Sequence, residues 1–315
     1  MKQVTLDNKK AAGGERLSFK YIKKRLSFYI MLIPGLLAVF VFSYCTMPGI
    51  LMAFQDYDFV KGFFGSEWVG FRHIHDIFTM TTYRTAIINT IVLNTVTILI
   101  SFSLPIIFAL LLNEIRDGIA KKSMQTISYL PHFLSWVSIV AITYSLFARD
   151  GFINDLRVLL LGQGTERIMF MAQPRNFVPI YIGLYIWQSL GWDSVIYLAA
   201  ISGVDQQLYE AVKIDGGNRF SQVIHVTLPS ILPTIIVLFI LKMGTMFADN
   251  FDLVFGLQNA YVDFEVISTV VYKSGIKQAN YSMATAMGLI QGVFGFILMA
   301  AVNVASRKIS EVSLW

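Results

Sequence analysis

Six long stretches of mostly apolar residues dominate this chain of 315 residues and restrict what it can fold into. A helix of about 18 or more such residues can cross a hydrocarbon core about 30 Å thick. Charged residues make up only 14% of the chain, against about 25% in ordinary soluble domains. The sequence therefore predicts an all-α, polytopic membrane protein with six transmembrane helices. These lie near residues 28–53, 86–112, 124–147, 178–203, 229–248 and 284–305.

The distribution of lysine and arginine predicts the orientation of these helices. With six spans, both termini lie on one side, which receives fifteen of these residues against nine on the other. Lys20, Lys23, Lys24 and Arg25 directly precede the first span, where positive charge most strongly favours the cytoplasmic side. Both termini and the loop at 204–228 are therefore expected in the cytoplasm. This topology, with a basic arm against anionic membrane lipid, accounts for the net charge of +5 without a nucleic-acid partner.

One membrane domain, residues 21–315, is expected to follow a short polar tail at 1–20. The first apolar run is too long for a removed signal peptide and is kept as a span. Its single cysteine, Cys45, has no partner for a disulfide or a metal site. The three external loops, of about thirty residues each, are too short to form domains of their own.

A polar segment between the fourth and fifth spans carries the clearest local signals. Asp205 is a good N-cap for a short helix over 206–214. The apolar face of this helix is expected to consist of Leu208, Ala211 and Val212. The alternative to a functional loop is an amphipathic segment that lies on the lipid surface.

Two glycines follow this helix and predict a turn. Gly216 is expected to need a positive φ, so a β-branched residue there should disturb the loop far more than alanine at Gly217. A second helical piece begins over 219–227, and Pro229 is expected to end it as the fifth span starts.

The order of residues in this segment resembles the EAA loop of binding-protein-dependent ABC importer permeases. That loop reads E-A-A, three residues, Gly, nine residues, I-x-L-P. Here Glu210-Ala211-Val212 is followed at the same spacing by Gly216 and by Val226-Thr227-Leu228-Pro229. Further runs at 62–70, 121–122, 125–136 and 186–200 are similar to the polysaccharide and lipoprotein-type permeases of the carbohydrate uptake family.

The resemblance implies a type I importer permease in a bacterial cell membrane. It also implies a second permease subunit, expected to be a different chain, two cytoplasmic ATP-binding subunits, an extracellular solute-binding protein and an oligosaccharide that moves inward. In such a permease the EAA loop, here 204–229, receives force from the ATPase. The coupling residues implied are Glu210, Ala211, Val212, Asp215, Gly216, Leu228 and Pro229.

The chain itself has no G-x-x-x-x-G-K-[ST] motif, so ATP is not expected to bind here in the Walker manner. The protein is expected to be no enzyme and to need no cofactor. The run His73-Ile74-His75-Asp76 lacks further ligands at zinc spacing, so ordinary loop polarity is favoured over a metal site. Serines without a G-x-S-x-G context give little support to an intramembrane hydrolase.

Polar residues inside the spans are candidates for a substrate pathway. A charge at mid-membrane costs about 2.5–3.5 kcal/mol on insertion scales, so it normally faces a bundle interior or water. Lys242 is such a charge, and the positions 246, 249 and 250 are expected to share its helix face. The pathway candidates are Tyr185, Gln188, Ser189, Trp192, Lys242, Met246, Asp249 and Ser138, with Asp193 beside them. The alternative is that these residues only join neighbouring helices or lie at headgroup level.

Two other function classes are weighed against the importer. A secondary transporter usually has two related halves or a longer helix set, which six unrepeated helices do not offer. A membrane scaffold would not transport at all. Ala284, Gly288 and Gly292 form a small-residue stripe on the sixth span, which packs either within the chain or between two permeases.

Overall fold

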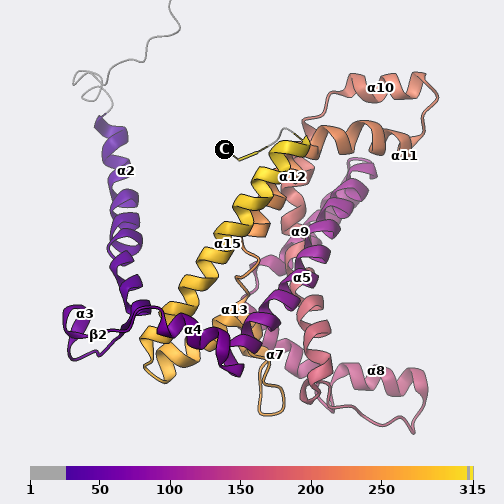
Figure 1. Ribbon diagram of the computed structural model, residues 1–315. Coiled ribbons are helices and arrows are strands. Elements are labelled where there is room, and N and C mark those ends of the chain that lie inside the picture. The colour runs from indigo at the N-terminus through magenta and orange to yellow at the C-terminus, as the bar shows by residue number, and fades with distance from the viewer. Residues whose placement is uncertain (1–25, 311–312, 315) are drawn as a thin grey trace, which may run out of the picture. The chain divides into compact units, whose positions relative to one another are not determined.

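The computed structural model describes residues 26–310 and 313–314, so the predicted tail at 1–20 lies outside the described residues. The described chain is mostly helical, with a short antiparallel pair of strands, β1 Gln55–Asp56 and β2 Glu67–Trp68 (Figure 1). It divides into two units, residues 1–51 and residues 52–315.

The first unit contains the helix α2 Leu26–Val39 and the π-helical turn η1 Phe40–Tyr44. Together with η2 Met47–Phe54 they form an apolar helical stretch of 29 residues, which matches the first predicted span. α2 buries none of its residues within the chain. A helix that is apolar on all sides needs lipid or another protein around it.

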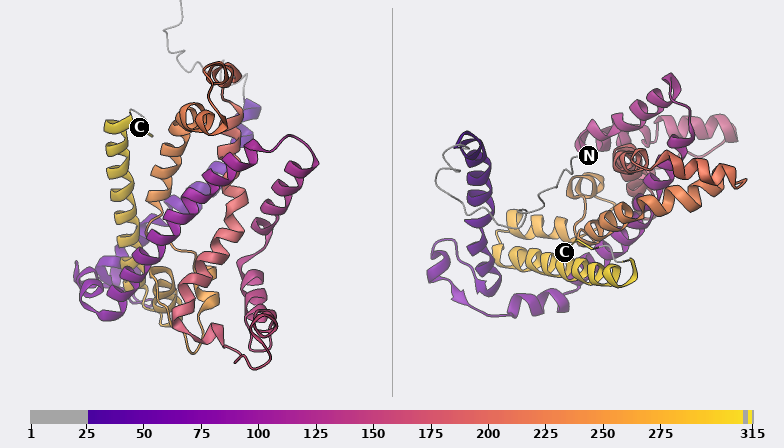
Figure 2. Two further views of the ribbon diagram at one scale, coloured as in Figure 1. Left: turned by 90° about the vertical axis from the view of Figure 1, so that its right-hand side faces the viewer. Right: turned by 90° about the horizontal axis from the view of Figure 1, so that it is seen from above.

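Long helices form the body of the second unit. They are α5 Thr81–Glu114, α9 Phe177–Ser202, α12 Leu228–Gly244 and α15 Tyr281–Ser310. α5 packs along α9, and α12 contacts both α9 and α15 (Figures 1 and 2). A buried cluster of Ala109, Tyr197, Ile201 and Ile231 joins α5, α9 and α12.

Glycines set the closest helix contacts. A Cβ at Gly191 of α9 would lie 2.1 Å from the carbonyl oxygen of Ser128 on α6 Ile119–Tyr129. A Cβ at Gly295 of α15 would lie 2.7 Å from the carbonyl oxygen of Gly244, the last residue of α12. Any side chain at either glycine would therefore push the two backbones apart.

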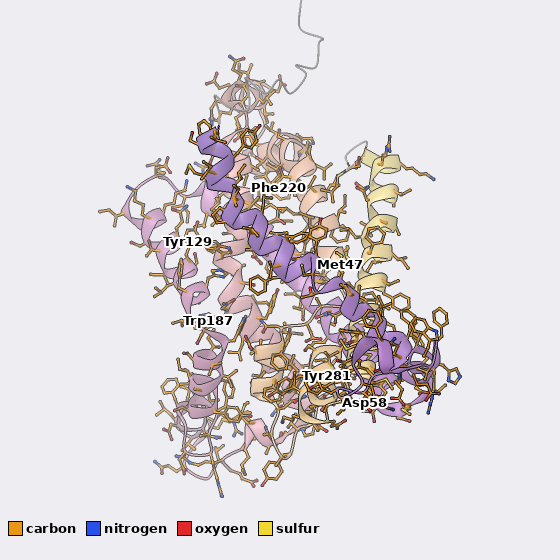
Figure 3. The ribbon with its side chains drawn as sticks, turned by 90° about the vertical axis from the view of Figure 1, so that its left-hand side faces the viewer. Met47, Asp58, Tyr129, Trp187, Phe220 and Tyr281 are labelled. Carbon is orange, nitrogen blue, oxygen red and sulfur yellow. The ribbon has the colours of Figure 1, made fainter. Side chains whose placement is uncertain are left out.

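Short elements gather at the two ends of these helices. α10 Gln206–Ile214 and α11 Arg219–Gln222 lie at one end, which Phe220 marks in Figure 3, while Asp58 and Tyr281 lie toward the other. That other end carries α4 Arg72–Thr79, α8 Phe152–Leu161 and α13 Phe251–Leu257 (Figure 1). The remaining elements are α3 Gly62–Gly65, η3 Leu130–Phe133, α7 Trp136–Leu146, η4 Phe170–Ala172, η5 Pro174–Asn176, η6 Val223–Thr227, α14 Ile267–Tyr272 and η7 Lys273–Lys277.

The third predicted span is not one helix. Between η3 and α7 the chain bends by 99°, because Leu134 and Ser135 are extended and Ser135 begins a new helix by accepting a hydrogen bond from the Ser138 backbone N–H at 3.2 Å. By length and composition the described residues contain four helices able to cross a membrane, or five if this bent pair is one span. α9 matches the fourth predicted span in position, but its polar residues leave it outside that count.

Candidate functional site

The loop predicted to couple to an ATPase begins as expected from the sequence. α10 spans Gln206–Ile214, and the Asp205 carboxylate accepts a hydrogen bond from the Gln207 backbone N–H at 2.9 Å. This N-cap satisfies one of the free N–H groups of the first turn. The helix therefore starts where the capping residue predicts.

The predicted apolar face of α10 is only partly correct. Val212 is half-buried, but Leu208 and Ala211 are exposed. Tyr209 takes the inner position instead, because its hydroxyl lies 3.0 Å from that of Thr227 and ties α10 to η6. Sequence periodicity missed this because a tyrosine can pack its ring inward and still satisfy its hydroxyl.

The two glycines end α10 with a Schellman motif. The Gly217 N–H donates to the Val212 carbonyl at 2.8 Å, and the Gly216 N–H donates to the Lys213 carbonyl at 3.1 Å. Gly216 has a φ of 81°, which confirms the predicted left-handed turn. A Cβ at Gly217 would lie 2.4 Å from Val212 Cγ1 and 2.9 Å from its carbonyl oxygen. This contact argues against a much milder effect of alanine at Gly217 than of valine at Gly216, which stays a prediction.

We accordingly expect Gly216→Val and Gly217→Ala each to lower recovery of the assembled transporter severalfold. The first forces a β-branched residue into a left-handed conformation at a cost of about 1 kcal/mol or more, and the second opens the hydrogen-bonded turn. Copurification with the ATP-binding subunit measures recovery. Gly203→Ala is the matched control, because a Cβ there comes no closer than 3.4 Å to a neighbour. Normal recovery of Gly217→Ala would show that Val212 can move aside.

The second half of the loop runs without interruption into α12. Asn218 caps α11 by accepting from the Ser221 N–H at 2.8 Å, and the helix continues through the π-helical turn η6. The prediction that Pro229 ends this piece is wrong. The wider π turn directly before the proline accommodates its ring and its missing N–H, so the helix is not broken. Leu228, at the start of α12, is half-buried, and Pro229 is exposed.

The loop is joined to α5 and presents an unpaired carboxylate. The Arg219 guanidinium donates to Glu114 Oε2, at the end of α5, at 2.9 Å. Glu210 is exposed and has no ion pair or side-chain hydrogen bond within the described residues, and Asp215 is exposed at the C-cap. Ile214 and Phe220, 86% and 71% exposed, add apolar surface beside it. This rigid, partly apolar surface with an unpaired charge is suited to binding another protein.

A cavity of about 540 Å³, lined by both polar and apolar side chains, lies within the second unit, midway along α5 and α9. Lys242 of α12 faces it and donates a hydrogen bond to the Tyr185 hydroxyl of α9 at 3.2 Å. No carboxylate of the described chain lies within 4.0 Å of the Lys242 ammonium. Asp193 lines the same cavity, and Asp249 lines it while accepting hydrogen bonds from the hydroxyl and backbone N–H of Ser268.

Aromatic and amide side chains complete the cavity wall. The Tyr185 ring is stacked between Trp136 and Tyr181, with centroid distances of 6.1 and 6.2 Å. Asn94 of α5 donates to the Met246 carbonyl at 2.8 Å and so holds the chain beyond α12. The Ser101 hydroxyl is buried and has no hydrogen-bond partner within the described residues. The wall thus offers donors, acceptors and flat rings to a polar ligand.

The structure brings together only some of the predicted pathway residues. Tyr185, Lys242 and Asp249 line the cavity. Gln188 is buried and donates to the His132 carbonyl at 3.4 Å, while Trp192 stacks on the His132 ring at 4.5 Å. The others do not line the cavity either: Ser189 and Met246 are buried, and Ser138 interacts with Ser135.

The expectation that positions 242, 246, 249 and 250 share one face of the fifth helix is wrong. α12 ends at Gly244, with Thr245 as its C-cap, and the chain then turns. Sequence reasoning also missed Asn94, Thr97 and Ser101, which line the cavity from α5. These three residues could have been identified from the sequence, because they recur at helical spacing as a polar stripe on an otherwise apolar span.

Known proteins share this architecture and are related in sequence over most of the chain. Residues 101–311 match the family described as "Binding-protein-dependent transport system inner membrane component". The chain is 42% identical over 304 residues to the polygalacturonan/rhamnogalacturonan transport system permease protein YteP of Bacillus subtilis (strain 168), covering 96% of this chain and 94% of the relative. It is 40% identical over 307 residues to Protein LplB of the same organism, covering 96% of each.

Among solved structures, a chain of a bacterial alginate ABC transporter, in complex with alginate pentasaccharide-bound periplasmic protein, has a TM-score of 0.84 and 34% identity. The match covers 95% of this chain and 100% of that chain. The family match at residues 101–311 includes the coupling loop, α9, α12 and the C-terminal part of α5. The chain therefore belongs to the binding-protein-dependent transport system inner membrane component family and is a permease subunit of an ABC importer.

Proposed function

We propose that this permease carries an oligosaccharide, delivered by an extracellular solute-binding protein, through the cavity between α5, α9 and α12. The cavity is the observation that carries this proposal. Its volume lies in the range of small-molecule sites, about 300–1,000 Å³. Its hydroxyl, amide and charged groups can hydrogen-bond sugar hydroxyls, and its apolar side chains can contact the carbon face of a sugar ring.

Lys242 gives the cavity one position suited to an acidic sugar, whereas Asp193 and Asp249 on the same wall suit sugar hydroxyls. Lys242 is the sole lysine or arginine on the described cavity wall, and no carboxylate of the described chain pairs with it. A half-buried cation without a carboxylate partner gains from an anionic ligand, since it otherwise bears part of the cost of lost hydration. The names of two relatives refer to polygalacturonan/rhamnogalacturonan and to alginate, which is called an acidic polysaccharide. We therefore assign Lys242 to a substrate carboxylate.

The proposed assembly contains two permeases, two cytoplasmic ATP-binding subunits and the solute-binding protein. Six spans with both termini in the cytoplasm of a bacterium fit the lysine and arginine distribution. The small-residue stripe of α15 supports the partner permease, because Gly288 and Gly292 are exposed and nothing lies within 4 Å of a Cβ at either. Ala284 alone packs inside the chain, against Gly275. The open part of the stripe is therefore free for a helix of another chain.

Cysteine labelling of the assembled transporter tests the pathway. In a Cys45→Ser background, Tyr185→Cys and Lys242→Cys should react with a small water-soluble thiol reagent. The rate should change severalfold when ATP drives the opposite-facing state, and oligosaccharide should protect both sites. Gln188→Cys is the matched control on α9 and should stay slow, because Gln188 is 8% exposed and its amide donates to the His132 carbonyl.

A second control, Gln163→Cys in an exposed loop, shows that the reagent is active. If positions 185 and 242 stay inert in every state while position 163 reacts, the cavity is not on the substrate route. Reaction that is the same with and without ATP would argue against alternating access at this site.

A further inference from the structure

The helix α8 presents an apolar face outward. Four of its exposed apolar side chains share one side of the helix, because Phe152, Leu156, Leu159 and Leu160 recur at i, i+4, i+7 and i+8, while the exposed Leu161 at its last position lies on the other side. Leu159 and Leu160 are 80% and 73% exposed. Leucine side chains on a helix in contact with water normally face the protein interior. This outward face is therefore expected to contact lipid or another protein.

Two polar residues outside this apolar face, Asn154 and Asp155, hold α8 in place. Asn154 is fully buried, and its amide donates to the carbonyls of Ala148 and Ile168 at 3.0 and 2.8 Å while its oxygen accepts from the Ile168 N–H at 3.0 Å. Arg167 forms an ion pair with Asp155 at 2.7 Å. These contacts bind α8 to the segment that follows it, so the helix cannot roll to hide its leucines.

The direction of the apolar face follows from where that segment lies. α8 runs crosswise to the long helices of its unit, at the end remote from α10, and the segment at 162–169 lies on the side of α8 that faces away from those helices (Figures 1 and 2). Asn154 faces this segment. Leu156 and Leu160 therefore face the opposite side of α8, which is the side nearer the long helices.

We propose that α8 is an interfacial helix. Its face formed by Phe152, Leu156, Leu159 and Leu160 is embedded at the boundary between headgroups and acyl chains, in the outer leaflet of the membrane that the permease spans. The segment at 162–169, with Glu166 and Arg167, then lies in water. Placement in the outer leaflet rests on the proposed orientation. A helix with one apolar and one charged side at the end of membrane spans is the arrangement that lies in the plane of a bilayer surface.

Two observations favour lipid over a protein as the cover. The preceding helix α7 also exposes apolar side chains, Ile142 and Leu146. A solute-binding protein docks and leaves, which would return this face to water at about 25 cal/mol per Å² of apolar area in every cycle, whereas lipid covers it permanently. α8 also joins α7 to the segment that leads into α9, so a lipid anchor here steadies the depth of the helix that carries Tyr185.

Spin-label accessibility tests the proposal in the whole transporter, reconstituted in lipid nanodiscs. Nitroxide labels on Leu156→Cys and Leu160→Cys, in a Cys45→Ser background, should collide with oxygen in preference to a water-soluble nickel chelate. The preference should be at least threefold greater than for the matched label on Gln163→Cys, which is exposed on the neighbouring turn. The labels should lie about 5–10 Å below the headgroup boundary.

Two results would overturn the proposal. Nickel accessibility at 156 and 160 equal to that at 163 would place α8 in water. Protection from both reagents would place it under a protein. Neither readout depends on transport, so failure here is separable from failure of the proposed substrate pathway.

Discussion

ATP-driven uptake is expected to fall at least tenfold when Glu210 is replaced by lysine, with insertion of the permease unchanged. The carboxylate is exposed, and the described chain offers it no partner. The helix that carries it is held near its middle by the Tyr209 contact with Thr227 and at its C-terminal end by the turn at Gly216. A charge on such a rigid helix can pair with a basic group of the ATP-binding subunit and fix the docking register. A lysine there converts this attraction into repulsion, and like charges at an interface cost several kcal/mol.

Uptake into vesicles, ATP hydrolysis and copurification of the ATP-binding subunit should be measured together for Glu210→Lys. Glu166→Lys is the matched control, because it makes the same change of charge at an exposed glutamate remote from α10. We expect normal uptake in the control. In Glu210→Lys we expect either lost assembly or hydrolysis without transport. Uptake at the wild-type level in Glu210→Lys would show that Glu210 is not needed at the coupling interface.

A single methyl group at Gly191 is expected to destabilise the protein by about 3 kcal/mol. The added Cβ would lie 2.1 Å from the Ser128 carbonyl oxygen and 2.4 Å from its carbon, both backbone atoms that cannot rotate away. α6 must therefore shift relative to α9. Because Trp192 stacks on His132 just beyond α6, the shift would also disturb the wall behind the cavity.

Gly183→Ala, on the same helix, is the matched control for Gly191→Ala. Nothing lies within 4 Å of a Cβ at Gly183, so alanine there should be neutral or stabilising by up to about 1 kcal/mol through helix propensity. For Gly191→Ala we expect a severalfold lower yield of monodisperse protein and a melting temperature lower by roughly 6 °C or more. Equal melting temperatures for the two variants would mean that the α6 contact is not rigid.

The coupling loop is the part of the site that local sequence signals predict best. Asp205 as a cap and Gly216 at positive φ act within one or two turns of the chain, and both lie where the sequence places them. The apolar face of α10 was less predictable, because it depends on the contact of Tyr209 with Thr227, eighteen positions later in the chain. The need for glycine at 217 depends in the same way on where the Val212 side chain turns.

The sequence by itself determined the membrane class, the helical content and the family, because apolar runs and the spacing of a short loop are local properties. Only the tertiary structure decided which polar residues share a cavity. Lys242 and Tyr185 meet Asn94 and Ser101 because α5, α9 and α12 pack side by side, whereas Gln188 turns to His132 and Met246 lies beyond the end of α12. Helical periodicity says which residues share a face, but only packing between distant segments says what that face meets.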